Sequence, residues 1–115
     1  MNIEKTITPW GSWEVLLDAD YCKAKRIIVN PSKRLSYQKH FKRSEVWTVV
    51  KGVAAITIDG TTKDYKVGDV AMIPQEAAHR ITNNAKEPVV IIETQLGTYF
   101  GEDDIVRLED DYGRS

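Results

Sequence analysis

Cysteine and long apolar runs are the scarcest features of this 115-residue chain. The single cysteine, Cys22, cannot form an internal disulfide, which fits a reducing compartment. No apolar run approaches the roughly 20 residues that a membrane-spanning helix needs. The N-terminal stretch MNIEKTITPWGSWEVLL contains acidic residues and lacks the sustained apolar segment of a signal peptide. We therefore expect a cytoplasmic protein with no membrane association.

An excess of charge of one sign is also missing. Sixteen basic residues stand against seventeen acidic ones, so the net charge is −1. This balance argues against general binding of nucleic acid, although a local basic cluster can still bind a phosphorylated small molecule. The length predicts one domain over residues 1–115, large enough to bury a core without disulfides.

Helical spacing of apolar residues is scarce, whereas short alternating runs separated by turn residues recur along the chain. The expected strands are residues 13–17, 22–29, 35–41, 45–51, 53–58, 61–66, 69–73, 79–83 and 89–96. Asp59-Gly60, between two alternating runs, is the strongest hairpin signal. Many short strands at this spacing are typical of an all-β sandwich or barrel, for which a double-sheet jelly roll is one solution. The acidic tail, residues 101–115, is expected to form a short helix, a strap or a solvated end.

Two short segments carry side chains of the types that hold metal ions. Gln38, His40 and Glu45 lie close together, and His79 follows later in the chain. Because alternate residues of a strand share a face, Gln38 and His40 point together. By the same alternation Glu45 faces inward with Trp47, and a buried carboxylate is costly unless a partner such as a metal ion compensates it. The alternative is ordinary structural use: a buried histidine, a surface histidine, and a glutamate paired with a neighbouring cation.

The spacing of these residues favours the metal site. Residues 38–52 read Q-x-H-x4-E-x6-G, and residues 68–83 read G-x5-P-x-E-x2-H-x3-N. The two motifs, in this order, resemble those of the cupin superfamily, with Glu76 in place of a glycine. The resemblance implies an all-β cupin double-stranded β-helix, or jelly-roll barrel, holding one divalent metal ion. The implied ligands are Gln38, His40, Glu45 and His79, and zinc is the first expectation, with manganese, cobalt, nickel or iron as alternatives.

The likeness extends beyond the superfamily and covers nearly the whole chain. The segments that resemble type II phosphomannose isomerases are residues 9–15, 25–27, 35–40, 43–50 and 101–107. In many of those proteins this domain is the C-terminal part of a bifunctional chain that also carries a mannose-1-phosphate guanylyltransferase. The 115 residues contain no Gly-rich nucleotide loop, so guanylyl transfer is not expected of them.

The resemblance implies interconversion of mannose 6-phosphate and fructose 6-phosphate, a metal-dependent aldose–ketose isomerisation. The metal would polarise the sugar carbonyl and stabilise the enediolate. The family's HHHR stretch, however, reads HFKR at residues 40–43, and Val46 replaces a further histidine. The missing histidines are candidate acid–base groups. The alternative function is therefore a non-catalytic or differently specific cupin that binds a sugar or sugar nucleotide.

Basic side chains near the motifs are candidates for binding the substrate phosphate. Arg43 lies inside the first motif and is the first candidate, both as a catalytic and as a substrate-binding residue. Arg80 follows His79, but strand alternation turns it away from that side chain. Lys25 and Arg26 are neighbours on an expected strand, so one of them must face inward. Each of these cations has the alternative of being a solvated surface charge.

The general base is harder to identify from the sequence. Glu93 shares the direction of Val89 and Ile91 and would then line the barrel as a catalytic residue. Its alternative is a glutamate on the rim, paired with a lysine.

The expected partners are a small-molecule sugar phosphate and a second copy of the chain. Trp10, Trp13 and Trp47 are able to stack on a sugar ring, although packing in a core or an interface is the commoner use of tryptophan. Small jelly rolls bury sheet edges by pairing, which favours a homodimer.

Overall fold

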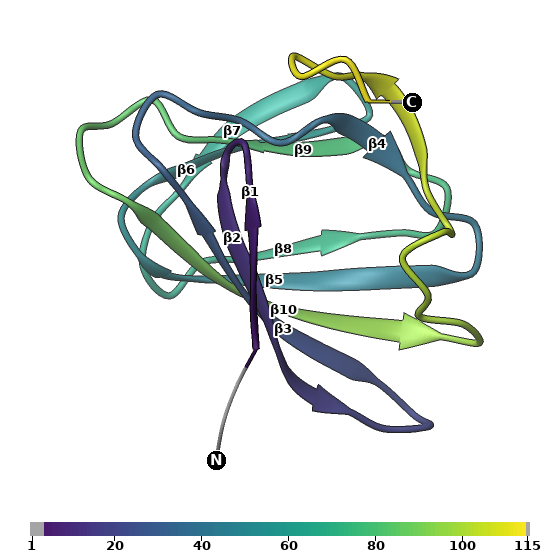
Figure 1. Ribbon diagram of the computed structural model, residues 1–115. Helices are drawn as coiled ribbons and strands as arrows, with labels where there is room; N and C mark the ends of the chain where they lie inside the picture. Colours follow the sequence, from purple (N-terminus) through teal and green to yellow (C-terminus); the bar gives the residue numbers. More distant parts are fainter. Residues whose placement is uncertain (1–3, 115) are drawn as a thin grey trace.

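The computed structural model describes residues 4–114, which form two antiparallel sheets facing each other across a common core (Figure 1). The strands are β1 (Lys5–Thr8), β2 (Gly11–Asp18), β3 (Lys23–Val29), β4 (Tyr37–Lys39), β5 (Arg43–Lys51), β6 (Ala54–Ile58), β7 (Thr61–Tyr65), β8 (Val70–Ile73), β9 (His79–Thr82), β10 (Val89–Gly97) and β11 (Val106–Glu109). The described residues include no helix long and apolar enough to span a membrane.

The order of the strands is that of a double-sheet barrel. One sheet has six strands in the order β1-β2-β3-β10-β5-β8, and the other has five in the order β11-β4-β9-β6-β7. In Figure 1, β3, β5, β8 and β10 form the lower layer, and β4, β6, β7 and β9 form the upper one. The predicted all-β jelly-roll fold is confirmed.

Strict alternation of burial along the two long central strands explains why the sheets pack face to face. In β5 and β10, every second side chain is buried between the sheets, while the intervening ones face outward. Trp47 and Val49 of β5 pack with Ile91 of β10 in the apolar cluster. Each large apolar side chain buried in this way contributes up to about 1.5–3 kcal/mol.

The interior changes from apolar to polar along the strands. Inward positions of β10 pass from Val89 and Ile91 to Glu93 and Gln95. Antiparallel β5, whose Glu45 pairs with Gln95, becomes polar at the same level of the barrel. The apolar end therefore supplies the core, and the polar end is where a site can form.

The turn residues behave as their conformational preferences predict. Asp59 and Gly60 join β6 to β7, and both have positive φ angles, 46° and 83°. Two left-handed residues in a two-residue hairpin define the primed turn that matches the twist of the flanking strands. Gly97, at the end of β10, lies so close to the chain before β5 that a Cβ atom there would stand 2.2 Å from the carbonyl oxygen of Lys42.

Three regions differ from the sequence-based expectation. The expected strand over residues 35–41 is reduced to the three residues of β4, and β1 and β11 were not expected. For the acidic tail, the structure shows the strap among the expected alternatives, and the side chains of residues 101–114 stay at least partly exposed. Residues 98–105, here named the strap, cross from β10 to β11 over the polar end of the barrel, and β11 then pairs with β4.

Candidate functional site

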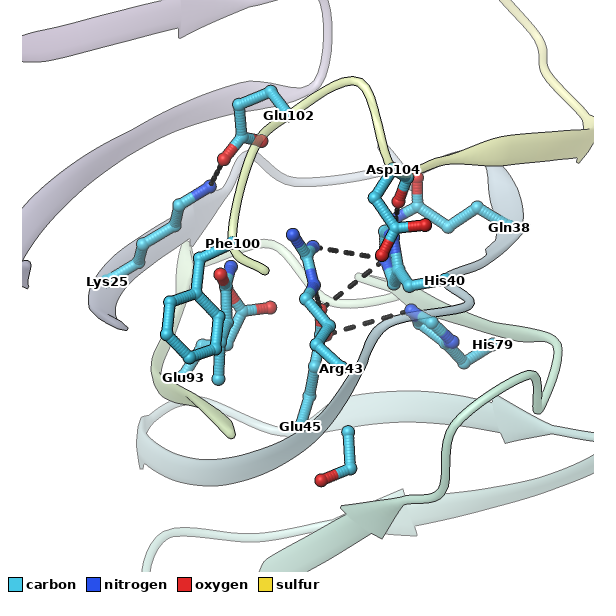
Figure 2. Close-up of polar contacts among 12 residues, drawn as sticks. Lys25, Gln38, His40, Arg43, Glu45, His79, Glu93, Phe100, Glu102 and Asp104 are labelled. Atoms are coloured by element: carbon cyan, nitrogen blue, oxygen red, sulfur yellow. Dashed lines mark hydrogen bonds and ion pairs between the residues drawn. The ribbon is translucent and has the colours of Figure 1, made fainter. Parts of the chain in front are cut away.

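Three ligand-type side chains meet at the polar end of the barrel. His40 follows β4, Glu45 lies on β5, and His79 begins β9; all three are buried. Their candidate ligand atoms lie within 4.8 Å of one another (Figure 2). The His40 Nε2 atom is 3.4 Å from Glu45 Oε2, and the His79 Nε2 atom is 3.7 Å from Glu45 Oε1.

Backbone carbonyls fix the orientation of both imidazoles. His40 Nδ1 lies 2.6 Å from the carbonyl oxygen of Asp104, and His79 Nδ1 lies 2.9 Å from that of Ala77. A carbonyl oxygen only accepts hydrogen bonds, so each Nδ1 carries the proton and each Nε2 presents a lone pair to the centre. This is the arrangement by which outer groups orient metal-binding histidines.

Burial keeps both rings neutral, which is the form that binds metal. Burial, with the Arg43 charge as a smaller cause, lowers the pKa of His40 to about 4. Burial likewise lowers the pKa of His79. His79 Nε2 is a buried polar atom with no hydrogen-bond partner among residues 4–114. Two neutral imidazoles, one of them with an unsatisfied lone pair, and a carboxylate are a donor set that fits a divalent metal ion.

Arg43 competes for the same atoms. Its Nε donates to Glu45 Oε2 at 2.7 Å, and its Nη2 lies 3.2 Å from His40 Nε2. The guanidinium thus neutralises the carboxylate and uses the lone pair that would otherwise face a metal ion. Its Nη1 is buried without a hydrogen-bond partner among the described residues, so this placement leaves one donor unsatisfied.

Gln38 lies on β4 beside the histidine pair. It pairs in register with His79 and lines the cavity next to the triad. Its Oε1 accepts a hydrogen bond from Ser36 Oγ at 3.0 Å. The role of Gln38 as a fourth ligand stays a prediction, as do the ligand roles of the triad.

A second carboxylate lies behind the triad. Trp47 Nε1 donates to Glu45 Oε1 and to Glu93 Oε1, both at 3.0 Å, and Gln95 Nε2 donates to Glu93 Oε2 at 2.9 Å. Glu93 is therefore an interior residue and not a lysine-paired glutamate on the rim. Burial, with the nearby Glu45 charge as a smaller cause, raises the pKa of Glu93 to about 7. Its catalytic role stays a prediction.

One member of the triad, His40, lines a cavity of about 100 Å³, and so does Arg43, which donates to Glu45. Three tryptophans, Trp10, Trp13 and Trp47, form part of its wall, together with residues of the strap. Its cationic lining residues are Lys25, Arg43, Arg107 and Arg114, and its acidic ones are Glu93 and Glu102. The lining therefore has more basic than acidic side chains.

Only two of the four predicted substrate-binding residues lie at the cavity. Lys25 and Arg43 line the cavity. Arg26 faces outward, where it forms a two-bond ion pair with Glu14, and is not at the cavity. Arg80 lies on the outer face of β9 and donates to Glu109. Alternation along β3 and β9 turns Arg26 and Arg80 away from the interior, so neither lines this cavity, and their role in binding substrate stays a prediction.

Two basic residues of the cavity are missing from the sequence-based prediction. Arg107 lies on β11 in register with Gln38, and Arg114 follows from the C-terminal segment. Arg114 is held by two hydrogen bonds from its guanidinium to Asp110. The parity of Arg107 would have indicated an inward side chain only if β11 had first been recognised as a strand.

Comparison with curated proteins gives bacterial relatives that are named as guanylyltransferases or as proteins of polysaccharide biosynthesis. A mannose-1-phosphate guanylyltransferase of Sinorhizobium fredii is 41% identical over 91% of this chain and 20% of its own length. The alginate biosynthesis protein AlgA of Pseudomonas aeruginosa is 45% identical over 93% of this chain and 22% of its own. The Escherichia coli mannose-1-phosphate guanylyltransferase is 42% identical over 92% and 22%. The chain thus spans about a fifth of these relatives.

Solved structures agree with the fold. A capsular polysaccharide assembling protein, CapF from Staphylococcus aureus, superposes with a TM-score of 0.80 at 22% identity, over 95% of this chain and 33% of that one. A cupin-2 domain from Rhodospirillum rubrum gives a TM-score of 0.74 at 13% identity, over 89% and 78%. At these identities the likeness concerns the fold alone.

These relatives contradict the predicted isomerase activity. They are named for guanylyl transfer or for polysaccharide biosynthesis, and not for conversion of mannose 6-phosphate to fructose 6-phosphate. The prediction of a mannose-6-phosphate isomerase is therefore wrong, and the alternative of a cupin with a different role is better supported. The error came from carrying an activity over with a fold, although activity depends on the particular site.

The match to a family model extends over nearly all of the chain. It covers residues 2–110, including both histidine motifs, β1 to β11 and the strap between the last two strands. Together with the jelly-roll fold, this shows that the chain belongs to the cupin family described as "Mannose-6-phosphate isomerase C-terminal".

Proposed function

We propose that this domain binds a phosphorylated sugar, either a sugar phosphate or a sugar nucleotide, in a metal-containing cavity at the polar end of the barrel. The observation that carries the proposal is that a buried metal-type donor set reaches, through His40, a cavity whose lining has more basic than acidic side chains. The names of the relatives, which concern mannose 1-phosphate, alginate and xanthan, support a sugar ligand.

The proposed metal ion would be held by His40, Glu45 and His79, with Gln38 as the candidate fourth ligand. A bound divalent ion would supply a centre of positive charge for sugar or phosphate oxygens. Zinc suits the two imidazoles and one carboxylate, and manganese, cobalt, nickel and iron are the alternatives.

The remaining lining residues have complementary roles. Lys25 and Arg43 provide positive charge for phosphate oxygens, and Arg107 and Arg114 extend this charge along the wall. Trp13 offers an indole face of the kind on which sugar rings pack. Binding by this domain, in place of isomerisation, is consistent with the histidines that the chain lacks.

Metal analysis and calorimetry test the proposal together. The purified chain is expected to bind one equivalent of divalent metal, and Glu45→Gln is expected to weaken that binding by at least about tenfold. Glu76→Gln makes the same chemical change at an exposed carboxylate and serves as the matched control. Metal-loaded protein is then titrated with mannose 1-phosphate, a guanosine diphosphate sugar and unphosphorylated mannose.

We expect the two phosphorylated ligands to bind more tightly than mannose. Equal metal affinity in Glu45→Gln and Glu76→Gln would refute the metal site. Failure of both phosphorylated ligands to bind, or equal binding of plain mannose, would refute the ligand class.

A further inference from the structure

The middle of the strap is attached to the barrel chiefly by two lysines of β3. Lys25 Nζ donates to Glu102 Oε2 at 2.6 Å (Figure 2), and Lys23 Nζ lies 3.4 Å from the same oxygen. Lys23 Nζ also donates to the carbonyl oxygen of Phe100 at 3.3 Å. Removing the Glu102 carboxylate would therefore release most of the hold that β3 has on residues 100–102.

Backbone hydrogen bonds secure the two ends of the strap independently of Glu102. The N–H of Thr98 donates to the carbonyl oxygen of Lys42. At the other end, the Asp104 carboxylate accepts hydrogen bonds from the N–H groups of Phe41 and Lys42, at 3.1 and 2.9 Å. The strap is thus anchored at both ends and held at its middle by an ion pair, which allows the middle to move while the ends remain in place.

The ion pair between Lys25 and Glu102 joins a buried side chain to an exposed one. Its side chain is only 5% exposed, whereas that of Glu102 is 49% exposed. The ammonium lies 4.0 Å from the centre of the Trp13 ring, inside the cavity lining. A buried ammonium requires a compensating anion, and here Glu102 of the strap provides it.

Because the cavity is small, the ion pair between Lys25 and Glu102 obstructs the binding of a ligand. Pockets that take small molecules usually measure roughly 300–1,000 Å³, and the cavity here measures about 100 Å³. Glu102 and Ile105 of the strap are part of its wall. A sugar phosphate therefore fits only when the strap moves outward, and that movement withdraws the anion from Lys25.

We infer that Lys25 is the subsite for the anionic oxygens of the ligand, and that Glu102 occupies it as an internal competitor until the ligand arrives. The inference rests on the proposed binding of a phosphorylated sugar. It adds that Lys25 receives the phosphate and that the phosphate displaces Glu102. Phosphate oxygens replace the carboxylate at the ammonium, and the released strap opens the cavity to the volume that the sugar needs. The same chemistry serves free phosphate, a sugar phosphate or a sugar nucleotide.

Glu102→Gln tests the competitor directly. This variant keeps the size of the side chain and removes its charge, so affinity for mannose 1-phosphate is expected to rise about three- to tenfold. The lower end of this range allows for the solvent exposure of Glu102, which weakens an ion pair. Asp103→Asn is the matched control, because it removes one charge from the adjacent strap residue, whose carboxylate contacts Tyr99 and not Lys25.

Lys25→Met tests the subsite itself. Its affinity for mannose 1-phosphate is expected to fall at least about tenfold, and Lys25→Arg, which keeps the charge, is expected to retain most of the binding. Thermal unfolding of both variants establishes that they are folded before titration. Inorganic phosphate and a guanosine diphosphate sugar, titrated in parallel, show which phosphorylated source the subsite prefers.

Hydrogen exchange supplies a readout that needs no ligand. Amides of the strap are expected to exchange faster in Glu102→Gln than in Asp103→Asn or the unmodified chain. If the unmodified chain binds mannose 1-phosphate and Glu102→Gln binds it no better than Asp103→Asn, the competitor is refuted while the proposed function stands. If Lys25→Met binds normally, the subsite is refuted. If neither the unmodified chain nor Glu102→Gln binds any phosphorylated ligand, both proposals fail.

Discussion

Arg43 is the residue on which the state of the candidate metal centre depends. Its guanidinium contacts Glu45 and His40 at the atoms that a metal ion would use. A metal ion and this placement of Arg43 are therefore mutually exclusive. When a metal binds, the guanidinium has to turn into the cavity, where it becomes available to an anionic ligand.

Replacing Arg43 by methionine should separate the two states. Without metal, Arg43→Met leaves the buried Glu45 carboxylate without its cation, and loss of one member of a buried ion pair costs about 3–5 kcal/mol. With metal, the competitor is gone, so metal affinity should rise about tenfold or more and stability should recover. Thermal unfolding with and without zinc, together with calorimetry, measures both effects.

Arg26→Met is the matched control, because Arg26 pairs with Glu14 on the outer surface, away from the metal centre. It should leave metal affinity unchanged. A weaker metal affinity in Arg43→Met than in the unmodified chain would show that Arg43 supports the metal and does not compete with it.

The inward or outward direction of a side chain was predictable from the sequence where the residue lies on a strand with clear alternation. The inward directions of Glu45 and His79 follow from their apolar neighbours, whereas His40 was placed by the spacing of the first motif. The structure brings these three side chains together. Glu93 was harder, because a carboxylate at the end of an apolar strand fits the rim as well as the interior. Only the hydrogen bonds from Trp47 and Gln95, which join distant parts of the chain, account for its burial.

Strands were predictable to the extent that their own side chains carry a pattern. The expected bounds of β5 and β10 differ from the observed ones by no more than two residues, because both strands alternate between core and surface. In contrast, β1 and β11 are mostly exposed and carry little apolar periodicity. Pairing with β2 and β4 makes them strands, and such pairing depends on the tertiary fold.

The C-terminal segment after β11 provides a prediction about pH. Hydrogen bonds from Arg114 lower the pKa of Asp110 to about 2, from an ordinary value of 3.8. Because the folded-state pKa lies below the unfolded-state value, the Asp110 contacts stabilise the docked segment above about pH 4. That contribution should be lost as the pH falls from about 4 to about 2.

Hydrogen exchange of residues 106–114 checks this at a series of pH values. At pH 7, Asp110→Asn should exchange faster than the unmodified chain in this segment, and the difference should vanish as the pH approaches 2. Asp64→Asn, a change at an exposed carboxylate of β7, is the control and should alter nothing in the segment. A difference that is the same at pH 7 and at pH 2.5 would contradict the predicted role of the Asp110 charge.

The whole molecule has one surface that indicates self-association. The outer face of the six-stranded sheet is free of charged side chains over β5, β8 and most of β10. The outward-facing residues of these three strands are Ser44, Val46, Thr48, Val50, Val70, Met72, Val90, Ile92, Thr94 and Leu96. A two-fold axis places such a surface against its own copy without repulsion between like charges.

The edge of this face also favours a second copy of the chain. The 9, 4 and 9 residues of β5, β8 and β10, at about 3.4 Å along a strand and about 4.8 Å between strands, cover roughly 360 Å². A stable interface needs about 800 Å² from each partner, so a dimer would also include surface next to this face. The face ends at β8, the edge strand of the sheet, which carries Met72 with 65% of its surface exposed.

We therefore expect a homodimer that Met72→Glu converts to a monomer, because the change places one carboxylate from each copy in the apolar interface. Light scattering coupled to size-exclusion chromatography measures the mass of each form. Tyr21→Glu is the control: Tyr21 is 74% exposed but lies in the turn between β2 and β3, so its replacement should leave the dimer intact. A monomeric unmodified chain, or dissociation by both variants alike, would rule out this interface.

At the scale of the whole molecule, fold class followed from the sequence and activity did not. Many short alternating strands and two spaced histidine motifs are enough to indicate a cupin barrel. The cavity, by contrast, is completed by Arg107, Arg114 and Glu102, and these reach it only because the tail folds back over the barrel. The chemistry of the ligand depends on those residues, and short-range sequence patterns do not reveal where a returning tail comes to rest.

Along β3, β5 and β10 the inward side chains change from apolar to polar. The residues that determine the stability of the barrel and those that determine its choice of ligand therefore lie in separate halves of the same strands. Substitutions near Val29, Val49 and Val89 should alter how firmly the barrel holds together. Substitutions near Lys25 and Glu93 should alter what it accepts. A chain built in this way can acquire new ligands over evolutionary time while its apolar half continues to keep the barrel folded.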